Sequence, residues 1–135
     1  MPKGELLRLR YTESGMMEGY AYEMNIETHD NGDVVLRAMR ESYGKLYEKR
    51  LDAAAMDSVR RIIKEEQMYA YAESYRPTIQ VMDGYMWHFR AEFADSSFIQ
   101  SGGSNARPHG NGLEKLRAFA TELLKDAEVV EDKEK

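Results

Sequence analysis

The chain of 135 residues contains no cysteine. This absence excludes disulfide bonds, thiolate nucleophiles and cysteine-ligated zinc or iron–sulfur clusters. The sequence also lacks an apolar run of the about 18 residues that indicate a membrane-spanning helix, and its first residues lack the long apolar stretch of a signal peptide. We therefore expect a soluble, cytoplasmic protein that has no membrane partner.

An excess of positive charge is missing as well. The chain has 19 lysines and arginines against 24 acidic residues, a formal net charge of -5, and its basic residues are spread along the sequence. A nucleic-acid-binding surface needs concentrated positive charge to neutralise phosphates, so nucleic acid is not an expected partner. The three histidines, His29, His88 and His109, form no metal-ligand spacing. We expect neither a metal nor a cofactor.

Alternation of apolar and polar residues predicts the strands. Leu7, Leu9 and Tyr11 share one face of the first strand, and Asn31-Gly32 is a strong hairpin signal between the second and third. The expected strands run over residues 6–12, 20–27, 34–40, 45–51, 85–93 and 98–101. The first four form a meander.

Helical spacing occurs twice. Asp52 is a suitable N-cap for a helix to about Glu73, and Asn111, with Glu114 three residues later, would cap a second helix from about Leu113 to Lys125. The order ββββ-α-ββ-α predicts an α+β fold, a mostly antiparallel sheet of about six strands with the helices packed on one face. Residues 1–125 are expected to form a single domain, and residues 126–135 a charged flexible tail.

The two faces of the predicted sheet differ in chemistry. The alternation places Trp87 and its apolar neighbours Tyr85, Phe89 and Phe93 against the helices as core. The opposite face collects charged residues, which we interpret as a charge-paired solvated surface, with a ligand or partner surface as the alternative. These residues are Arg8, Arg10, Arg37, Arg90, Glu23, Glu27 and Glu92.

The segment SGGSNARPHGNG is the strongest candidate binding site. Glycines let backbone N–H groups approach a ligand, and the start of the following helix favours an anion. The segment matches neither GxGxxG nor GxxxxGK[ST], so an ordinary connecting loop is the alternative. The candidate contacts to a small anion are Gly102, Gly103, Ser104, Asn105, Arg107 and His109.

No catalytic residue can be assigned. Ser101 or Ser104 could be combined with His109 and Asp83 for acyl transfer, but no GxSxG motif positions a nucleophile. A tyrosine-rich helix end, which includes Tyr69 and Tyr71, would expose at least one aromatic side chain. A homo-oligomer or a protein partner that covers it is a non-catalytic use of this feature.

One pattern resembles a segment of small uncharacterised bacterial proteins. It comprises Asp83-Gly84, a strand with Trp87, the turn Phe93-Ala94-Asp95, the strand Ile99-Gln100-Ser101 and the loop Gly103-Ser104-Asn105-Ala106-Arg107-Pro108. The resemblance covers about the second half of the chain and implies that hairpin and loop form one unit. It implies no activity, cofactor or catalytic residue.

Two functional hypotheses follow. The first is a small non-catalytic bacterial module for protein association or modest ligand binding, since the sequence pairs no catalytic groups. The alternative is an anion-binding protein or hydrolytic enzyme that uses residues 101–112 and the start of the following helix.

Overall fold

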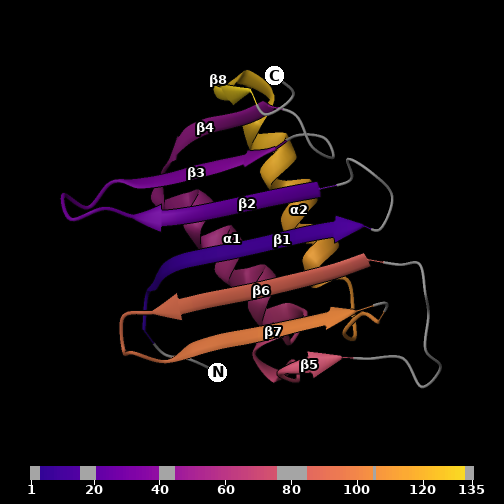
Figure 1. Cartoon of the computed structure of the whole chain (residues 1–135). Helices are drawn as coiled ribbons and strands as arrows, with labels where there is room; N and C mark the ends of the chain where they lie inside the picture. The colour runs from indigo at the N-terminus through magenta and orange to yellow at the C-terminus, as the bar shows by residue number, and fades with distance from the viewer. Residues whose placement is uncertain (1–3, 16–20, 40–44, 76–84, 105, 133–135) are drawn as a thin grey trace.

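The computed structural model describes residues 4–15, 21–39, 45–75, 85–104 and 106–132. The fold is α+β, as predicted, with one eight-stranded sheet in the order β5-β7-β6-β1-β2-β3-β4-β8 (Figure 1). Neighbouring strands are antiparallel except for β5 and β7, which are parallel. The strands are β1 (Leu6–Gly15), β2 (Ala21–Thr28), β3 (Val34–Met39), β4 (Lys45–Leu51), β5 (Ser74–Tyr75), β6 (Tyr85–Phe93), β7 (Phe98–Ser104) and β8 (Glu128–Asp132). The helices are α1 (Ala53–Glu65) and α2 (Gly112–Leu123), with short 3₁₀ turns η1 (Met68–Ala70) and η2 (Leu124–Asp126).

The sheet has two strands more than the six predicted, and both lie at its edges. The predicted charged tail from residue 126 is wrong for its first part, because β8 pairs with β4 and places Val129 opposite Tyr47. Backbone groups alone form such a ladder, so a charged composition does not prevent an edge strand. At the other edge, β5 is only two residues long and carries no periodic signal.

The first strand departs from simple alternation at its start. Leu9 and Tyr11 are buried as predicted, but Leu6 is buried whereas Leu7 is 37% exposed. The pairing of β1 with β6 shifts register between Leu6 and Arg8. Such an irregularity rotates the preceding residues to the opposite face, which explains the exchange of Leu6 and Leu7.

The first helix begins as predicted and ends early. The Asp52 side chain accepts a hydrogen bond from the Ala55 N–H at 2.8 Å, which confirms the N-cap. The helix ends at Glu65 instead of Glu73, because Gln67 adopts a left-handed conformation (φ 53°) that no α-helix continues through. After it, η1 returns the chain to the core through the buried Met68.

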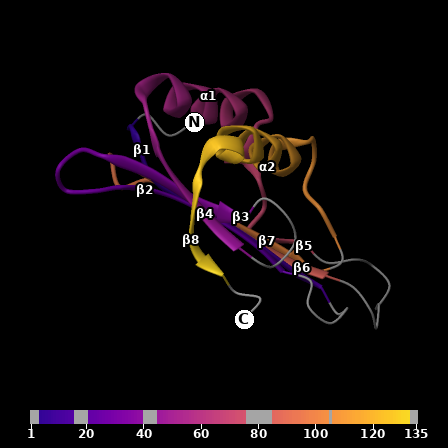
Figure 2. The ribbon, with the colours of Figure 1, turned by 90° about the horizontal axis from the view of Figure 1, so that it is seen from above.

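Both helices cover one face of the sheet, as predicted (Figure 2). Trp87 is completely buried, and the side chains of Phe89 and Phe93 lie in the same core. In the described part of the chain no helix covers the opposite face, which we call the open face. The sheet therefore has a helical side, which is covered, and an open side.

Candidate functional site

The first part of the predicted glycine-rich loop is strand. Gly102, Gly103 and Ser104 belong to strand β7, whose predicted end was Ser101. Asn105 lies outside the described residues, as does Asp83. The extended strand results from two-sided pairing, with β6 on one side and β5 on the other. Its glycines therefore form a sheet surface.

Gly103 is required for close packing against Trp87. The indole Nε1 donates a hydrogen bond to the Ala106 carbonyl at 2.7 Å. A Cβ at position 103 would lie 2.5 Å from that nitrogen and 2.6 Å from that oxygen. The glycine thus allows the buried indole to hold the chain that follows β7.

Arg107 and His109 point to different partners. Arg107 contacts Glu13 on β1 and Glu114 on α2, at 3.3 and 3.0 Å. His109 Nε2 lies 3.1 Å from the Gln67 carbonyl oxygen, and its ring is edge-on to Tyr71. The structure thus does not bring the two side chains together around a common ligand position.

The N-terminus of α2 binds an anion that belongs to the protein. The Glu66 carboxylate accepts a hydrogen bond from the Asn111 N–H at 2.7 Å, and Lys115 Nζ lies 2.7 Å from its other oxygen. The hydrogen bond from Lys115, followed by that from the Asn111 backbone, lowers the pKa of Glu66. An external anion at this helix end would have to displace Glu66. The predicted Asn111 side-chain cap is wrong, since Glu66 bonds the backbone there instead.

A buried carboxylate beneath α2 was not predicted from the sequence. Glu13 is 5% exposed and lies between Arg107 at 3.3 Å and Arg117 at 3.4 Å. The Tyr11 hydroxyl donates to the same carboxylate, and burial, reinforced by this contact, raises the pKa of Tyr11 far above its usual value. Glu13 follows Leu9 and Tyr11 at the same two-residue spacing, and this alternation was the sequence signal that it points inward.

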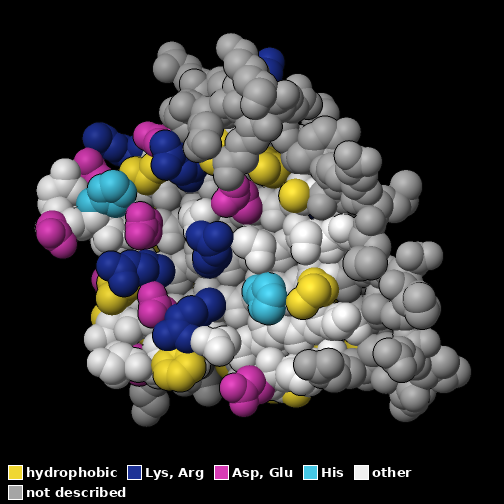
Figure 3. Space-filling model, in the orientation of Figure 1, with side chains coloured by type: hydrophobic (Ala, Val, Ile, Leu, Met, Phe, Trp, Pro, Cys, Tyr) yellow, Lys and Arg dark blue, Asp and Glu magenta, His cyan; other side chains and the backbone are white. Residues whose placement is uncertain are grey.

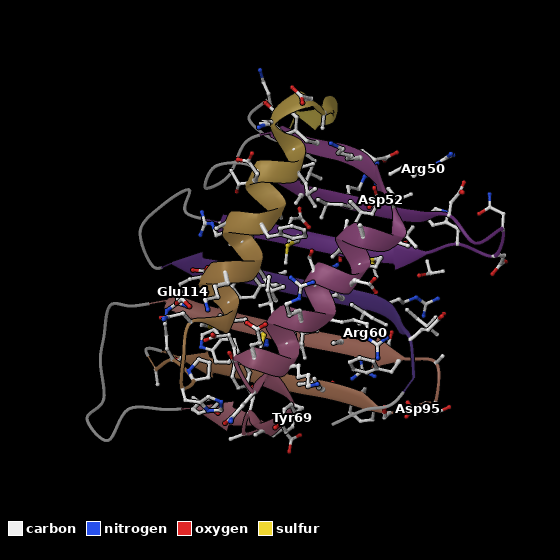
Figure 4. All side chains as sticks on the ribbon, turned by 180° about the vertical axis from the view of Figure 1, so that it is seen from behind. Arg50, Asp52, Arg60, Tyr69, Asp95 and Glu114 are labelled. Atoms are coloured by element: carbon white, nitrogen blue, oxygen red, sulfur yellow. The ribbon has the colours of Figure 1, made fainter. Side chains whose placement is uncertain are left out.

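The surroundings of Glu13 are closed by aromatic and helical groups. The Arg117 guanidinium lies 4.0 Å above the centre of the Tyr22 ring. Glu114, which carries the other ion pair of Arg107, stands near the start of α2 (Figure 4). A cavity of about 240 Å³ borders this cluster. Two carboxylates and two arginines balance their charges, so the cluster joins β1 to α2 without surplus charge.

A larger groove, of about 640 Å³, lies at β5, β6 and β7 and reaches β1. Its described lining combines cationic, polar and glycine residues with one exposed methionine. The lining residues are Arg10, Glu73, Ser74, Tyr75, Met86, His88, Phe89, Arg90, Gln100, Ser101, Gly102, Gly103 and Ser104. Three predicted contacts, Gly102, Gly103 and Ser104, are therefore part of this groove.

Comparisons of the chain with protein-family models, curated proteins and solved structures found no match. Among the described residues, no helix is long and apolar enough to cross a membrane. The same residues contain no group of three or more histidine or acidic side chains placed to hold a metal ion.

Two arginines lie side by side at one end of the groove. The register of β1 and β6 places Arg10 directly opposite Arg90, and such side chains start about 4.5–5.5 Å apart at Cβ. Arg10 donates a hydrogen bond to the neutral Asn25 Oδ1 at 3.3 Å and forms no ion pair with any described residue. Arg90 contacts Glu92 at 3.2 Å and donates to Gln100. The groove therefore carries surplus positive charge at this position.

The neighbouring row of the open face has the arrangement that the sequence predicts. Arg8 lies between Glu27 and Glu92 on the two adjacent strands, at 3.8 and 3.7 Å. Further along the sheet, Arg37 pairs with Glu48 at 3.5 Å. Figure 3 shows cationic and acidic side chains interspersed on this face. Arg10 is the exception to this pairing among the arginines named for the face.

Gly102 shapes the floor of the groove beside these arginines. It lies opposite His88, and a Cβ at position 102 would be 3.0 Å from the His88 Nδ1 and 3.0 Å from the Trp87 carbonyl oxygen. The absent side chain makes room for the His88 ring beside the strand backbone between Gln100 and Ser104. The arrangement provides guanidinium and amide donors at one end of a shaped surface.

Proposed function

We propose that the protein is a small ligand-binding module that holds an anionic ligand in the groove on its open face. The observation that carries this proposal is the juxtaposition of Arg10 and Arg90, with no carboxylate paired to Arg10 among the described residues. Like charges directly opposite each other destabilise a sheet. An anion bound between them would offset that repulsion.

The rest of the open face supports a role in binding over simple solvation. In the adjacent row of the open face, carboxylates lie on both sides of Arg8, which is the arrangement of a charge-paired solvated surface. The residues directly opposite Arg10 on the two neighbouring strands are Asn25 and Arg90 instead, and no described carboxylate forms an ion pair with it. Surplus cations concentrated on an acidic protein, beside a groove, favour recognition of a negative group.

The arrangement also supports binding more than hydrolysis. Ser101 donates its hydroxyl to the Ala72 carbonyl and is buried. His109, the base considered with it, contacts the Gln67 carbonyl and the Tyr71 ring. The described groove thus offers hydrogen-bond donors and a shaped surface to a ligand. Association with another protein stays a separate prediction.

Titration of the protein with acetate, benzoate, sulfate and phosphate, followed by ¹H–¹⁵N NMR, tests the proposal. We expect at least one anion to shift the amide signals of Arg90, Gln100 and Gly102. The substitution Arg10→Gln should weaken this binding at least tenfold, because it removes the guanidinium that lacks an ion pair. Arg8→Gln, in the neighbouring row, is the matched control and should change the affinity less than threefold.

The proposal is wrong if none of these anions shifts the groove signals. It is equally wrong if Arg10→Gln binds as tightly as the unmodified protein. Shifts confined to Asn111 and Lys115 would instead locate anion binding at the start of α2, where Glu66 is bound.

A further inference from the structure

Resting on the proposed function, we infer that the ligand is an elongated organic monoanion with a carboxylate head and an apolar body lying along β7. The head would lie at Arg10 and Arg90, and the body would extend over Gly102 toward Ser104. Charge, floor and walls of the groove each contribute to this assignment.

The charge at the cationic end matches one negative charge. Arg90 is already in contact with Glu92 at 3.2 Å, whereas Arg10 has no ion pair in the described part of the chain. The surplus is therefore close to one positive charge. A carboxylate carries one negative charge and accepts two hydrogen bonds from a guanidinium, whereas a phosphate monoester carries about −1.5 to −2 at neutral pH. Glu73, on the opposite wall, further disfavours a dianion.

The floor of the groove is elongated and has no side chain of its own at its centre. Gln100, Gly102 and Ser104 are alternate residues of β7, so the floor between the first and the last is about 13 Å long. Gly102 contributes no side chain, and its N–H already donates to the Glu73 carbonyl at 3.1 Å. A ligand that covers this stretch meets no unpaired N–H of Gly102, so an apolar body loses no hydrogen bond there.

The wall on β6 favours an apolar body. Met86 is 50% exposed and lies opposite Ser104 on β6, next to His88 on the same face. Tyr75, from β5, also borders the groove, but its ring packs against Trp87, with 5.9 Å between the ring centres. The exposed thioether gains free energy when an apolar group covers it. A volume of about 640 Å³ lies within the range of small-molecule sites.

Calorimetric titration with four probes separates this ligand class from other anions. These four probes are 4-phenylbutyrate, its neutral amide, phenyl phosphate and inorganic phosphate; acetate, a carboxylate without the apolar body, is titrated beside them. We expect 4-phenylbutyrate to bind at least tenfold more tightly than each of the other three. Its amide keeps the body but lacks the charge, and inorganic phosphate lacks the body.

Two exposed apolar residues provide a matched pair of variants. Met86→Ala should weaken 4-phenylbutyrate at least threefold while leaving acetate unchanged, because only the body contacts the wall. Leu7→Ala, which removes an exposed side chain outside the groove lining, should change neither. Circular dichroism verifies that both variants are folded.

Tighter binding of phenyl phosphate or of inorganic phosphate would overturn the carboxylate assignment while leaving the anion-binding function intact. Equal binding of 4-phenylbutyrate and acetate, or no effect of Met86→Ala, would overturn the apolar body. Failure of every anion to bind would overturn the proposed function itself.

Discussion

Each face of the sheet brings two arginines close together, and their surroundings differ. On the helical side, Arg107 and Arg117 enclose the buried carboxylate of Glu13. On the open side, Arg10 and Arg90 lie opposite each other, and only Arg90 has an ion pair among the described residues. The first pair is neutralised within the protein, and the second retains charge at a groove.

The difference follows from the cost of burying charge. A charge removed from water must be paired, so arginines beneath α2 require a carboxylate at the sheet. On the open face water screens the repulsion between Arg10 and Arg90, so the sheet tolerates it at a modest cost. Surplus charge can therefore remain only where a ligand also has access.

The largest expected effect comes from unpairing the helical-side arginines. Glu13→Gln should lower the free energy of unfolding by about 3 kcal/mol, the lower end for a broken buried ion pair, because both arginines keep some solvent contact. Urea denaturation measures the change. Glu27→Gln, which removes an exposed ion pair, should change stability by less than about 0.5 kcal/mol. Equal effects of the two substitutions would refute the distinction between the faces.

A substitution at Gly103 should disturb the helical side of the sheet. Gly103→Ala places a methyl group against the Trp87 Nε1 and the Ala106 carbonyl, and overpacking of this kind costs about 1–3 kcal/mol. The ring should lose its hydrogen bond to Ala106, which precedes Arg107. The Trp87 indole N–H signal in NMR reports this loss. Ser104→Ala is the neighbouring control, and an unshifted indole signal in Gly103→Ala would contradict the expectation.

The smallest expected effect is at Arg10, where a substitution should increase stability instead of lowering it. Arg10→Gln removes the repulsion with Arg90 and should raise the free energy of unfolding by a few tenths of a kcal/mol at low salt. The gain should shrink as salt screens the charges. Arg8→Gln should instead lower stability slightly, because Arg8 lies between two carboxylates. A loss of stability in Arg10→Gln would show that the cation is structural.

Local patterns predicted the elements better than their connections. The alternation around Trp87 identified the core face, and Asp52 marked the start of α1. The inward position of Glu13 was readable from the series with Tyr11. Its partners were not, since they are 94 and 104 residues away and no local pattern relates them.

The groove could not be predicted without knowing the order of the strands in the sheet. Arg10 and Arg90 were both assigned to the solvated face, but their juxtaposition depends on the pairing of β1 with β6 and on its register. The glycines of β7 were predicted as candidate contacts. Their assignment to a loop missed that β5 pairs with them and extends the strand. Two-residue strands carry too little periodicity to be predicted.

The central place of β1 has a consequence for synthesis of the chain. Its partner β2 follows directly in the chain, but β6, the partner of its other edge, begins about 80 residues later, so that edge stays open until β6 has been synthesised. Glu13 stays without Arg117 for longer still. A nascent chain thus displays a long, half-apolar strand edge during much of its translation, when pairing with another nascent chain competes with completion of its own sheet.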